Sequence, residues 1–248
     1  YFAGYTGGRK SILPGIASYK TIEQNHSHAL SLEAQALKLA GNPVHLDMID
    51  ALKTLKGKKL FAIMTVMDKH HNVCSVTAGD IITSFDDAVS AAKAVFTTRI
   101  PRKADIVITC SSYPMDVDLY QAQKALDNGK LALNPGGILI LVSACREGVG
   151  DTAYIDLLSS CSTPEQVLEK IRAEYVLGYH KAAKMAEIAT WASMWGKTEL
   201  DDEILEKIFI RPVDDLQKAV DEALERKGEA AQVWIMPDGA MTVPLVDQ

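Results

Sequence analysis

The stretch Ala104-Asp105-Ile106-Val107-Ile108-Thr109-Cys110 decides the fold of this chain. Its β-branched apolar residues form an uninterrupted run, which is typical of a strand that is buried on both faces of a parallel sheet. A loop follows, and then a helical pattern from about 116 to 127. A buried strand that leads directly into a helix predicts parallel α/β folding around this stretch.

The same alternation continues toward the carboxyl terminus. Asn134-Pro135-Gly136-Gly137 predicts a turn before a second buried strand at 138–142. Further helices are expected at about 164–174, 180–191 and 214–226, with strands near 208–211 and at 232–236. We therefore expect a Rossmann-like parallel α/β sandwich as a second domain over residues 99–232. The tail, residues 233–248, is expected to return to the first domain.

The amino-terminal part, residues 1–98, gives a mixed pattern. Glycine, serine and threonine dominate the first sixteen residues, which predicts a loop. The later elements are expected to be helices at 18–40 and 44–55, a β-hairpin with strands at 59–67 and 73–77 around the turn Asp68-Lys69-His70-His71-Asn72, and an Ala-rich helix at 85–96. This predicts an α/β fragment with a β-hairpin, followed by a linker helix.

Composition excludes several classes of function. The chain has 248 residues and a net charge of -6 that is spread along it, so no basic stripe favours nucleic acid as a partner. No apolar run approaches the roughly 20 residues that a membrane helix needs. The four cysteines stand far apart and form no CxxC pair, which argues against a zinc ribbon and against a disulfide framework. The same pattern favours a reducing, cytoplasmic location.

The strongest local signal for a site is Gly4-Tyr5-Thr6-Gly7-Gly8-Arg9-Lys10-Ser11. Closely spaced glycines let backbone amides approach an anion, and Arg9 and Lys10 add positive charge. A phosphate-binding P-loop would have a glycine where Arg9 stands, so the match to that motif is incomplete. From the residues alone, this segment is an anion-binding loop or a flexible surface loop.

A second candidate site follows the strand at 104–110. Tyr120, Gln121 and Lys124 lie on the opening turns of the next helix, and ligands of open α/β sheets bind where strands end and helices begin. Gln121 and Lys124 are three residues apart and therefore share a helix face. An amide beside an ammonium group suits a small carboxylate or a phosphate, although composition alone favours a solvated helix face.

A larger pattern connects these signals. The run Tyr-Phe-Ala-Gly-Tyr-Thr-Gly-Gly-Arg-Lys-Ser-Ile-Leu-Pro-Gly-Ile-Ala at residues 1–17, with Tyr19-Lys20-Thr21-Ile22 and Asn25-His26, resembles the signature segment of nickel-pincer-nucleotide-dependent lactate racemases. The resemblance implies that Lys10, on the loop with Gly7 and Gly8, carries a covalently attached pyridinium-3-thioamide-5-thiocarboxylic acid mononucleotide that grips nickel. It also implies that His26, sixteen residues beyond Lys10, is a nickel ligand. Imidazole is a suitable ligand for nickel. Without the resemblance, His26 would be interpreted as a histidine on the surface of a helix.

The resemblance extends to the second candidate site. It covers 104–109, Tyr113-Pro114, Asp118-Leu119-Tyr120-Gln121-Ala122 and Lys124. It implies that Gln121 and Lys124 are catalytic residues that reach the cofactor and the substrate, and that Tyr120 contacts the cofactor. The expected function is racemisation or epimerisation of a small 2-hydroxy acid by reversible hydride transfer.

The resemblance also implies a partner. Chains of the family are longer, and their two acid/base histidines and a substrate-binding arginine would precede Tyr1, so we expect an amino-terminal segment or a separate chain, and an oligomer is compatible with the sequence. Lactate, malate and sugar acids all remain open as substrates. The alternative functions are a nucleotide- or phosphate-binding module without racemase chemistry, and a simple metal-binding protein that uses His26 and His28.

Overall fold

The computed structural model describes residues 2–68 and 70–247 and divides into two compact units. The first unit ends at Thr97 and the second begins at Thr98, whereas the sequence placed the boundary between residues 98 and 99. Lys69 of the expected hairpin turn lies outside the described residues. Among the described residues, no helix has the length and the apolar character that a membrane span requires.

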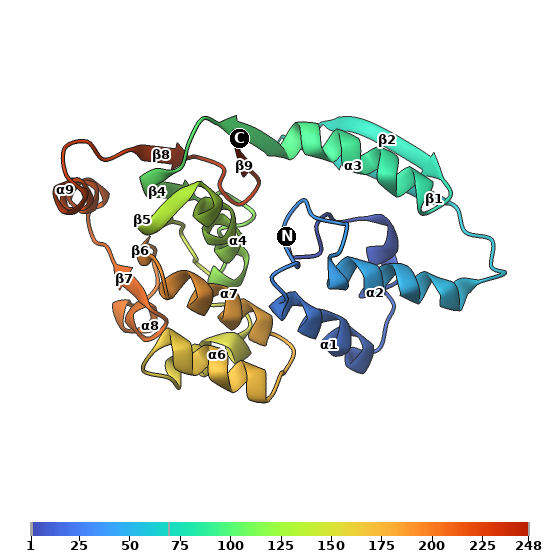
Figure 1. Cartoon of the computed structure of the whole chain (residues 1–248), viewed down its shortest axis with the longest axis horizontal. Coiled ribbons are helices and arrows are strands. Elements are labelled where there is room, and N and C mark those ends of the chain that lie inside the picture. The colour runs from blue at the N-terminus through green and yellow to red at the C-terminus, as the bar shows by residue number, and fades with distance from the viewer. Residues whose placement is uncertain (1, 69, 248) are drawn as a thin grey trace. The chain divides into compact units, whose positions relative to one another are not determined.

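A five-stranded parallel sheet forms the centre of the second unit (Figure 1). Its order is β7-β6-β5-β4-β8, with β4 at Ala104–Cys110, β5 at Leu133–Val142, β6 at Ser193–Lys197, β7 at Ile210–Pro212 and β8 at Val233–Met236. Neighbouring strands are parallel, and Ile106 of β4 pairs with both Ile138 and Val233. The expected parallel α/β fold is confirmed. Because the chain moves from β4 outward to β7 and then returns to the other side of β4, the strand order reverses between β4 and β8.

Helices cover both faces of this sheet. They are α4 (Leu119–Gly129), α5 (Thr152–Ser159), α6 (Pro164–Ala173), α7 (Tyr179–Ala189), α8 (Asp202–Lys207) and α9 (Leu216–Lys227). On one face, Ala219 and Ala223 of α9 pack with Ile106 and Trp195 in a single buried cluster. On the other face, Thr109 Oγ1 donates a hydrogen bond of 3.1 Å to the carbonyl of Ala125 in α4. This hydrogen bond fixes α4 against β4, the strand that precedes it in the chain.

The carboxyl-terminal tail belongs to the second unit, which corrects the expectation that it returns to the first domain. Its apolar strand β8 completes the sheet beside β4, and β9 (Val243–Val246) pairs with β3 (Thr97–Ile100). The turn between β8 and β9 packs tightly on β4, because a Cβ added at Gly239 would lie 1.9 Å from Thr109 Oγ1. A glycine is therefore required where the tail crosses the sheet.

The first unit is built from short elements. They are η1 (Gly8–Ser11), α1 (Tyr19–Ser27), η2 (His28–Leu30), α2 (Pro43–Ala51), η3 (Leu52–Leu55), β1 (Ala62–Met67), β2 (Val73–Gly79) and α3 (Thr83–Phe96). The antiparallel pairing of β1 and β2 confirms the predicted hairpin, and α3 lies along it (Figure 1). Met64 and Val66 of β1 pack with Phe85 and Ala88 of α3 in one buried cluster. A second cluster joins Phe2 and Leu13, which lie on either side of the glycine loop (residues 4–11), to α1 and α2.

The helix expected at 18–40 is much shorter than its apolar period suggests. It ends at Ser27, and residues 31–41 form turns. Ser31 Oγ accepts a hydrogen bond from the Glu33 amide, and the Leu37 amide donates to the Gly4 carbonyl over 3.0 Å. These bonds give the backbone partners that compete with helical ones, so the expected long helix is wrong beyond residue 27.

Candidate functional site

Three glycines with left-handed backbone conformations shape the glycine loop. Gly4, Gly7 and Gly8 have φ values of 81°, 87° and 52°, which side chains other than glycine rarely allow. At Gly8 there is also no room, because an added Cβ would lie 3.0 Å from Phe85 Cδ2 and 3.1 Å from Met64 Cε. At Gly7, by contrast, no atom lies within 4 Å of an added Cβ, so the loop is open at this point. The short helix η1 then begins and presents a half-buried Lys10.

Arg9 holds this loop from inside. Its side chain is 1% exposed, and its guanidinium group donates to the carbonyls of Ala3 (2.7 Å) and Gly7 (3.3 Å) and to His45 Nδ1 (3.0 Å). The group also lies 4.2 Å from the centroid of the Phe85 ring. Burial lowers the pKa of Arg9 to about 10, so it remains charged at neutral pH. Arg9 was expected to add positive charge for binding an anion. This expectation is corrected, because the buried guanidinium group stabilises the loop instead.

Lys10 and His26 interact electrostatically within the first unit. His26 lies in the last turn of α1, half-buried, with its ring edge-to-face against Phe2 at a centroid distance of 5.3 Å. Burial and, after it, the charge of Lys10 lower the pKa of His26 to about 4, while the backbone of Ile22 opposes this shift. A charge has such an effect only at short range. The imidazole is therefore neutral at pH 7, which is the form that binds metals.

A buried amide fixes the helix that carries His26. Asn25 is fully buried, and its Nδ2 donates to the Val44 carbonyl (3.2 Å) and to Asp47 Oδ2 (2.8 Å). These bonds tie the end of α1 to α2, and therefore limit the movement of the neighbouring histidine. Among the described residues, no three His, Cys, Asp or Glu side chains are arranged to hold a metal ion by themselves.

The opening turns of α4 bring Gln121 and Lys124 together in the second unit. Asp118 caps the helix by accepting a hydrogen bond of 2.7 Å from the Gln121 amide. Lys124 Nζ donates to Gln121 Oε1 over 2.6 Å and lies 3.4 Å from Met115 Sδ. The two side chains thus share a face, as their spacing predicts, and this face is half-buried instead of fully solvated. Burial lowers the pKa of Lys124, and the charge of Asp118 opposes this effect.

A buried lysine contacts Tyr120 in the first turn of the same helix. No sequence motif predicted the burial of this lysine. Lys181 of α7 is 2% exposed, and its Nζ donates to the Tyr120 carbonyl over 2.7 Å and lies 4.2 Å from the centroid of the Tyr120 ring. Burial, more than the charge of Lys124, lowers the pKa of Lys181 to about 8. The Tyr120 ring also packs edge-to-face on Tyr154. These contacts hold Tyr120 within the second unit. In the sequence, the signal for Lys181 is limited to its place on an Ala-rich helix.

Models of two protein families match the chain. A model described as the lactate racemase N-terminal domain matches residues 1–37, which include Lys10 and His26. A model described as the lactate racemase C-terminal domain matches residues 100–243, which include Gln121 and Lys124 and make up more than half of the chain. The chain belongs to the lactate racemase family.

Individual members of the lactate racemase family are similar over nearly the whole chain. The lactate racemase of Lactiplantibacillus plantarum is 32% identical over 96% of this chain, and that of Thermoanaerobacterium thermosaccharolyticum is 30% identical over 98%. This chain spans 58% of the length of each. The structure of the lactate racemase apoprotein from T. thermosaccharolyticum matches with a TM-score of 0.92 over 99% of this chain and 60% of that one. A Thermotoga maritima protein, 15% identical, shares the fold with a TM-score of 0.73 over 99% of this chain and 64% of its own.

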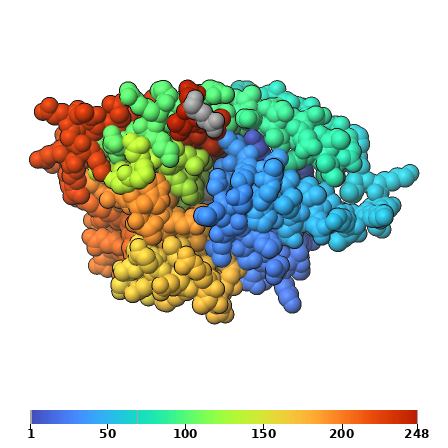
Figure 2. Space-filling model, viewed as in Figure 1, coloured from blue at the N-terminus to red at the C-terminus, as the bar shows by residue number. Residues whose placement is uncertain are grey.

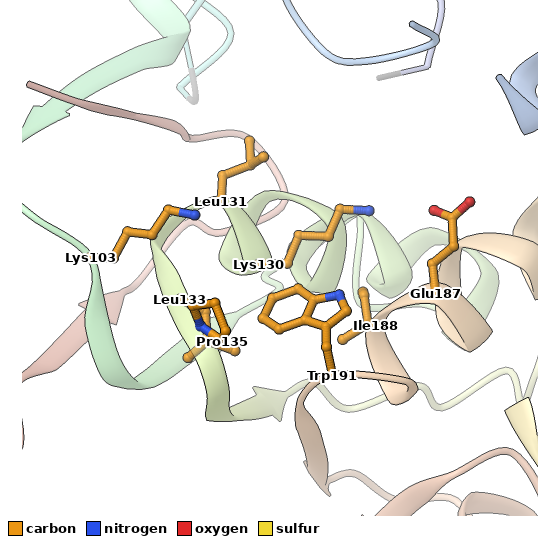
Figure 3. A pocket seen from close by; sticks show the side chains of 8 residues that line it. All are labelled: Lys103, Lys130, Leu131, Leu133, Pro135, Glu187, Ile188 and Trp191. Atoms are coloured by element: carbon orange, nitrogen blue, oxygen red, sulfur yellow. The ribbon is translucent and has the colours of Figure 1, made fainter. Parts of the chain in front are cut away.

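A cavity of about 350 Å³ in the second unit lies away from the predicted site residues. It is lined by Lys103, Lys130, Leu131, Leu133, Pro135, Glu187, Ile188 and Trp191. Figure 3 shows the Trp191 indole beside Ile188 and Pro135, with the charged ends of lysine and glutamate side chains around it. Lys103 precedes β4 and Leu133 begins β5, so this cavity is at the amino end of the strands, whereas α4 begins beyond the carboxyl end of β4. In this family member, the cavity and the Gln121–Lys124 face are thus separate features.

Replacing Asp118 by asparagine is expected to lower the pKa of Lys124 further. Asparagine caps a helix about as well as aspartate, but it removes the negative charge that raises this pKa. We expect acetylation of Lys124, followed by peptide mass spectrometry over a pH series, to begin at lower pH in the variant. Asp215→Asn is the matched control, because Asp215 caps α9 by accepting from the Lys218 amide over 3.1 Å. An unchanged Lys124 profile in Asp118→Asn would contradict this account.

Proposed function

We propose that this chain is part of an isomerase that racemises or epimerises a small 2-hydroxy acid with a nickel-pincer nucleotide attached to Lys10. One observation carries the proposal: the lactate racemase N-terminal domain model matches residues 1–37, and this segment folds into one unit with Lys10 on the glycine loop and a half-buried His26 whose pKa is lowered by burial and, after it, by the charge of Lys10. The amine suits covalent attachment, and the imidazole suits nickel. Membership of the lactate racemase family supports the same assignment.

The residues of the first unit fit such a group. Lys10 would hold it through a covalent bond, His26 would coordinate its nickel, and the open backbone at Gly7 leaves space beside the loop. The rigid positions of Gly8 and of Arg9 fix the loop that carries the amine. When bound, the group supplies a ring carbon that accepts a hydride from the acid and returns it.

Gln121 and Lys124 are proposed to bind and orient the acid. An ammonium group forms a charge-assisted hydrogen bond with a carboxylate, and such bonds are stronger where water is partly excluded. The half-buried face on which Lys124 already contacts Gln121 provides this setting. These groups recognise the carboxylate that lactate, malate and sugar acids have in common, so lactate is the first compound to test. Tyr120, held against Lys181, is proposed to contact the cofactor.

The proposed activity belongs to the chain together with further polypeptide. This chain spans 58% of the length of its curated relatives. The acid/base histidines that move the hydroxyl proton are assigned, from the family resemblance, to an amino-terminal segment or a separate chain. We also propose a cytoplasmic location, which the free thiols of Cys74, Cys110, Cys145 and Cys161 support.

Intact-protein mass spectrometry tests the proposal. The chain is produced in a host that makes the nickel-pincer nucleotide, and we expect a mass increase that peptide analysis assigns to Lys10. The lactate racemase of T. thermosaccharolyticum, produced in the same host, shows whether cofactor synthesis is active. An unmodified Lys10 beside a modified relative would reject the proposal.

The main alternative is a nucleotide- or phosphate-binding module without racemase chemistry. The arrangement of Arg9 weighs against it, because the guanidinium group that would contact a phosphate is buried against Phe85. ATP binding that is indifferent to nickel and lost in Lys10→Ala would favour this alternative. Nickel binding that survives Lys10→Ala would instead favour a simple metal-binding protein based on His26 and His28.

A further inference from the structure

The cavity at the amino end of the parallel sheet is formed by four segments of the second unit. They contribute Lys103 before β4, Lys130 and Leu131 in η4 (Lys130–Ala132), Pro135 in β5, and Trp191 after α7. The Gly136 amide donates to the Trp191 carbonyl over 2.7 Å, so the end of α7 is tied to β5. In the space-filling view, the yellow-green chain around η4 and β5 meets the orange chain of α7 at the surface of this unit (Figure 2). The cavity is therefore framed by fixed backbone segments.

Apolar side chains make up most of the lining. Leu133 and Ile188 are 0% exposed and line the cavity from the protein interior. The Trp191 indole lies beside Ile188 and Pro135 (Figure 3). The volume of about 350 Å³ is within the range of small-molecule pockets, roughly 300–1,000 Å³. Because aromatic rings pack favourably on an indole, offset or edge-to-face, the lining suits a ligand with a single apolar ring.

The charged side chains around the cavity leave one positive charge unbalanced. Lys130 Nζ donates to Asp127 Oδ1 over 2.9 Å, and Lys184 Nζ lies 3.2 Å from Glu187 Oε2. These two pairs each neutralise one charged side chain of the lining. Lys103 is exposed, and among the described residues it has no ion-pair partner. The cavity therefore favours a ligand that carries a single negative charge.

We propose that this cavity binds a small aromatic monocarboxylate. The ring of the ligand packs on Trp191, and its carboxylate accepts a charge-assisted hydrogen bond from the Lys103 ammonium group. A second donor lies nearby: in the part of the chain that the structure describes, the indole N–H of Trp191 has no acceptor. A phosphate monoester suits the site less, because it carries close to two negative charges at pH 7 and Lys103 balances one.

The proposed site is distinct from the site that we assign to the 2-hydroxy acid. Lys103 precedes β4, whereas Lys124 belongs to α4, which begins beyond the carboxyl end of that strand. A ligand in the cavity is therefore an additional ligand and does not compete with a carboxylate at Lys124. The inference goes beyond the proposed function and does not depend on it.

NMR of the tryptophan indole N–H groups tests this proposal on the full chain without cofactor. The chain has three tryptophans, and Trp191→Phe identifies the Trp191 signal by its loss. We expect phenylacetate to shift this signal saturably, with a dissociation constant on the order of 0.1–1 mM. The signal of Trp195, which is buried in the sheet core, should stay unchanged. Phenylethanol, which lacks the charge, should bind about fivefold more weakly, and acetate, which lacks the ring, should give no saturable shift.

Charge variants locate the carboxylate of the ligand. Lys103→Gln is expected to weaken phenylacetate binding by about fivefold, because an exposed ammonium group contributes modestly. Lys218→Gln is the matched control, since Lys218 is exposed on α9 and does not line the cavity. Lys124→Gln should also leave the titration unchanged, which separates this site from the face that carries Lys124. Because Lys103 is exposed, its variant should fold, and an unchanged Trp195 signal verifies this.

Four results would each overturn the proposal. The first is the absence of a saturable shift of the Trp191 signal up to about 10 mM phenylacetate. The others are equal affinity in the unsubstituted chain and in Lys103→Gln, tighter binding of phenyl phosphate than of phenylacetate, and loss of the shift in Lys124→Gln. Since the titration is made without cofactor, an unmodified Lys10 would reject the proposed function and leave this result standing.

Discussion

Lys10→Ala is expected to abolish covalent attachment of the cofactor. The proposed bond requires a primary amine at this position, and alanine removes it completely. Lys10→Arg should fail as well, because a guanidinium group keeps the positive charge but does not replace the amine as a nucleophile. Intact-protein mass spectrometry after production with active cofactor synthesis should show the adduct only in the unsubstituted chain. Lys20→Ala, on the exposed side of α1, is the control and should retain the adduct.

The same variants give a readout that needs no cofactor. In the apoprotein, the charge of Lys10 helps to lower the pKa of His26 to about 4. Lys10→Ala removes a nearby cation and should therefore raise this pKa, although not to 6.5, because burial is the larger cause and remains. Lys10→Arg retains the cation and should change the pKa less. An NMR titration of the His26 ring measures both. Retention of the adduct in Lys10→Ala, or an unchanged His26 titration, would contradict the assigned site.

The local strand signals in this sequence were sufficient to predict the centre of the fold. The predicted strand at 104–110 coincides with β4 because its β-branched residues are buried on both faces, so that propensity and environment agree. The hairpin was also predictable, since Val73 begins β2 and Met67 ends β1 as expected. In these segments, residues close in sequence determine the structure.

Elements whose stability depends on distant contacts were not predictable. Strand β6 contains Gly196, which lowers strand propensity. Its glycine is needed because an added Cβ would lie 2.9 Å from Ile210 Cγ2 of the neighbouring strand β7. Similarly, the chain leaves the helical conformation before Leu37, whose amide bonds to Gly4. Neither partner is visible in the local pattern.

The candidate site was likewise predictable only where residues close in sequence determine its geometry. Helical spacing alone predicts that Gln121 and Lys124 share a face, whereas the pairing of Lys10 with His26 came from the family resemblance. The inward positions of Arg9 and Lys181 were not predictable. Charged side chains are rarely buried, and in each of these two cases an acceptor that compensates for burial comes from a distant part of the chain: His45 for Arg9 and the Tyr120 carbonyl for Lys181.

Arg9→Ala is expected to destabilise the first unit by about 3–5 kcal/mol. The substitution leaves the carbonyls of Ala3 and Gly7 and the Nδ1 atom of His45 without their donor, and it leaves a cavity beside Phe85. Arg9→Lys should recover little of this loss, because an ammonium group cannot reproduce the planar fork that reaches three acceptors and stacks on the ring. Attachment of the cofactor to Lys10 should fall in parallel, since the loop geometry depends on the same contacts.

The measurement must report on the first unit alone. All three tryptophans, Trp191, Trp195 and Trp234, belong to the second unit, so their fluorescence would follow the wrong transition. Hydrogen exchange of peptides from residues 2–97 in a urea series reports directly on the first unit. Lys53→Ala is the matched control within the same unit: the Lys53 side chain is 77% exposed and pairs with Asp50, and such surface pairs contribute less than about 1 kcal/mol. If Arg9→Ala behaved like Lys53→Ala, the guanidinium group would not be what holds the glycine loop, and the loop would have to be stabilised by its glycines and by the packing of Gly8 on Phe85.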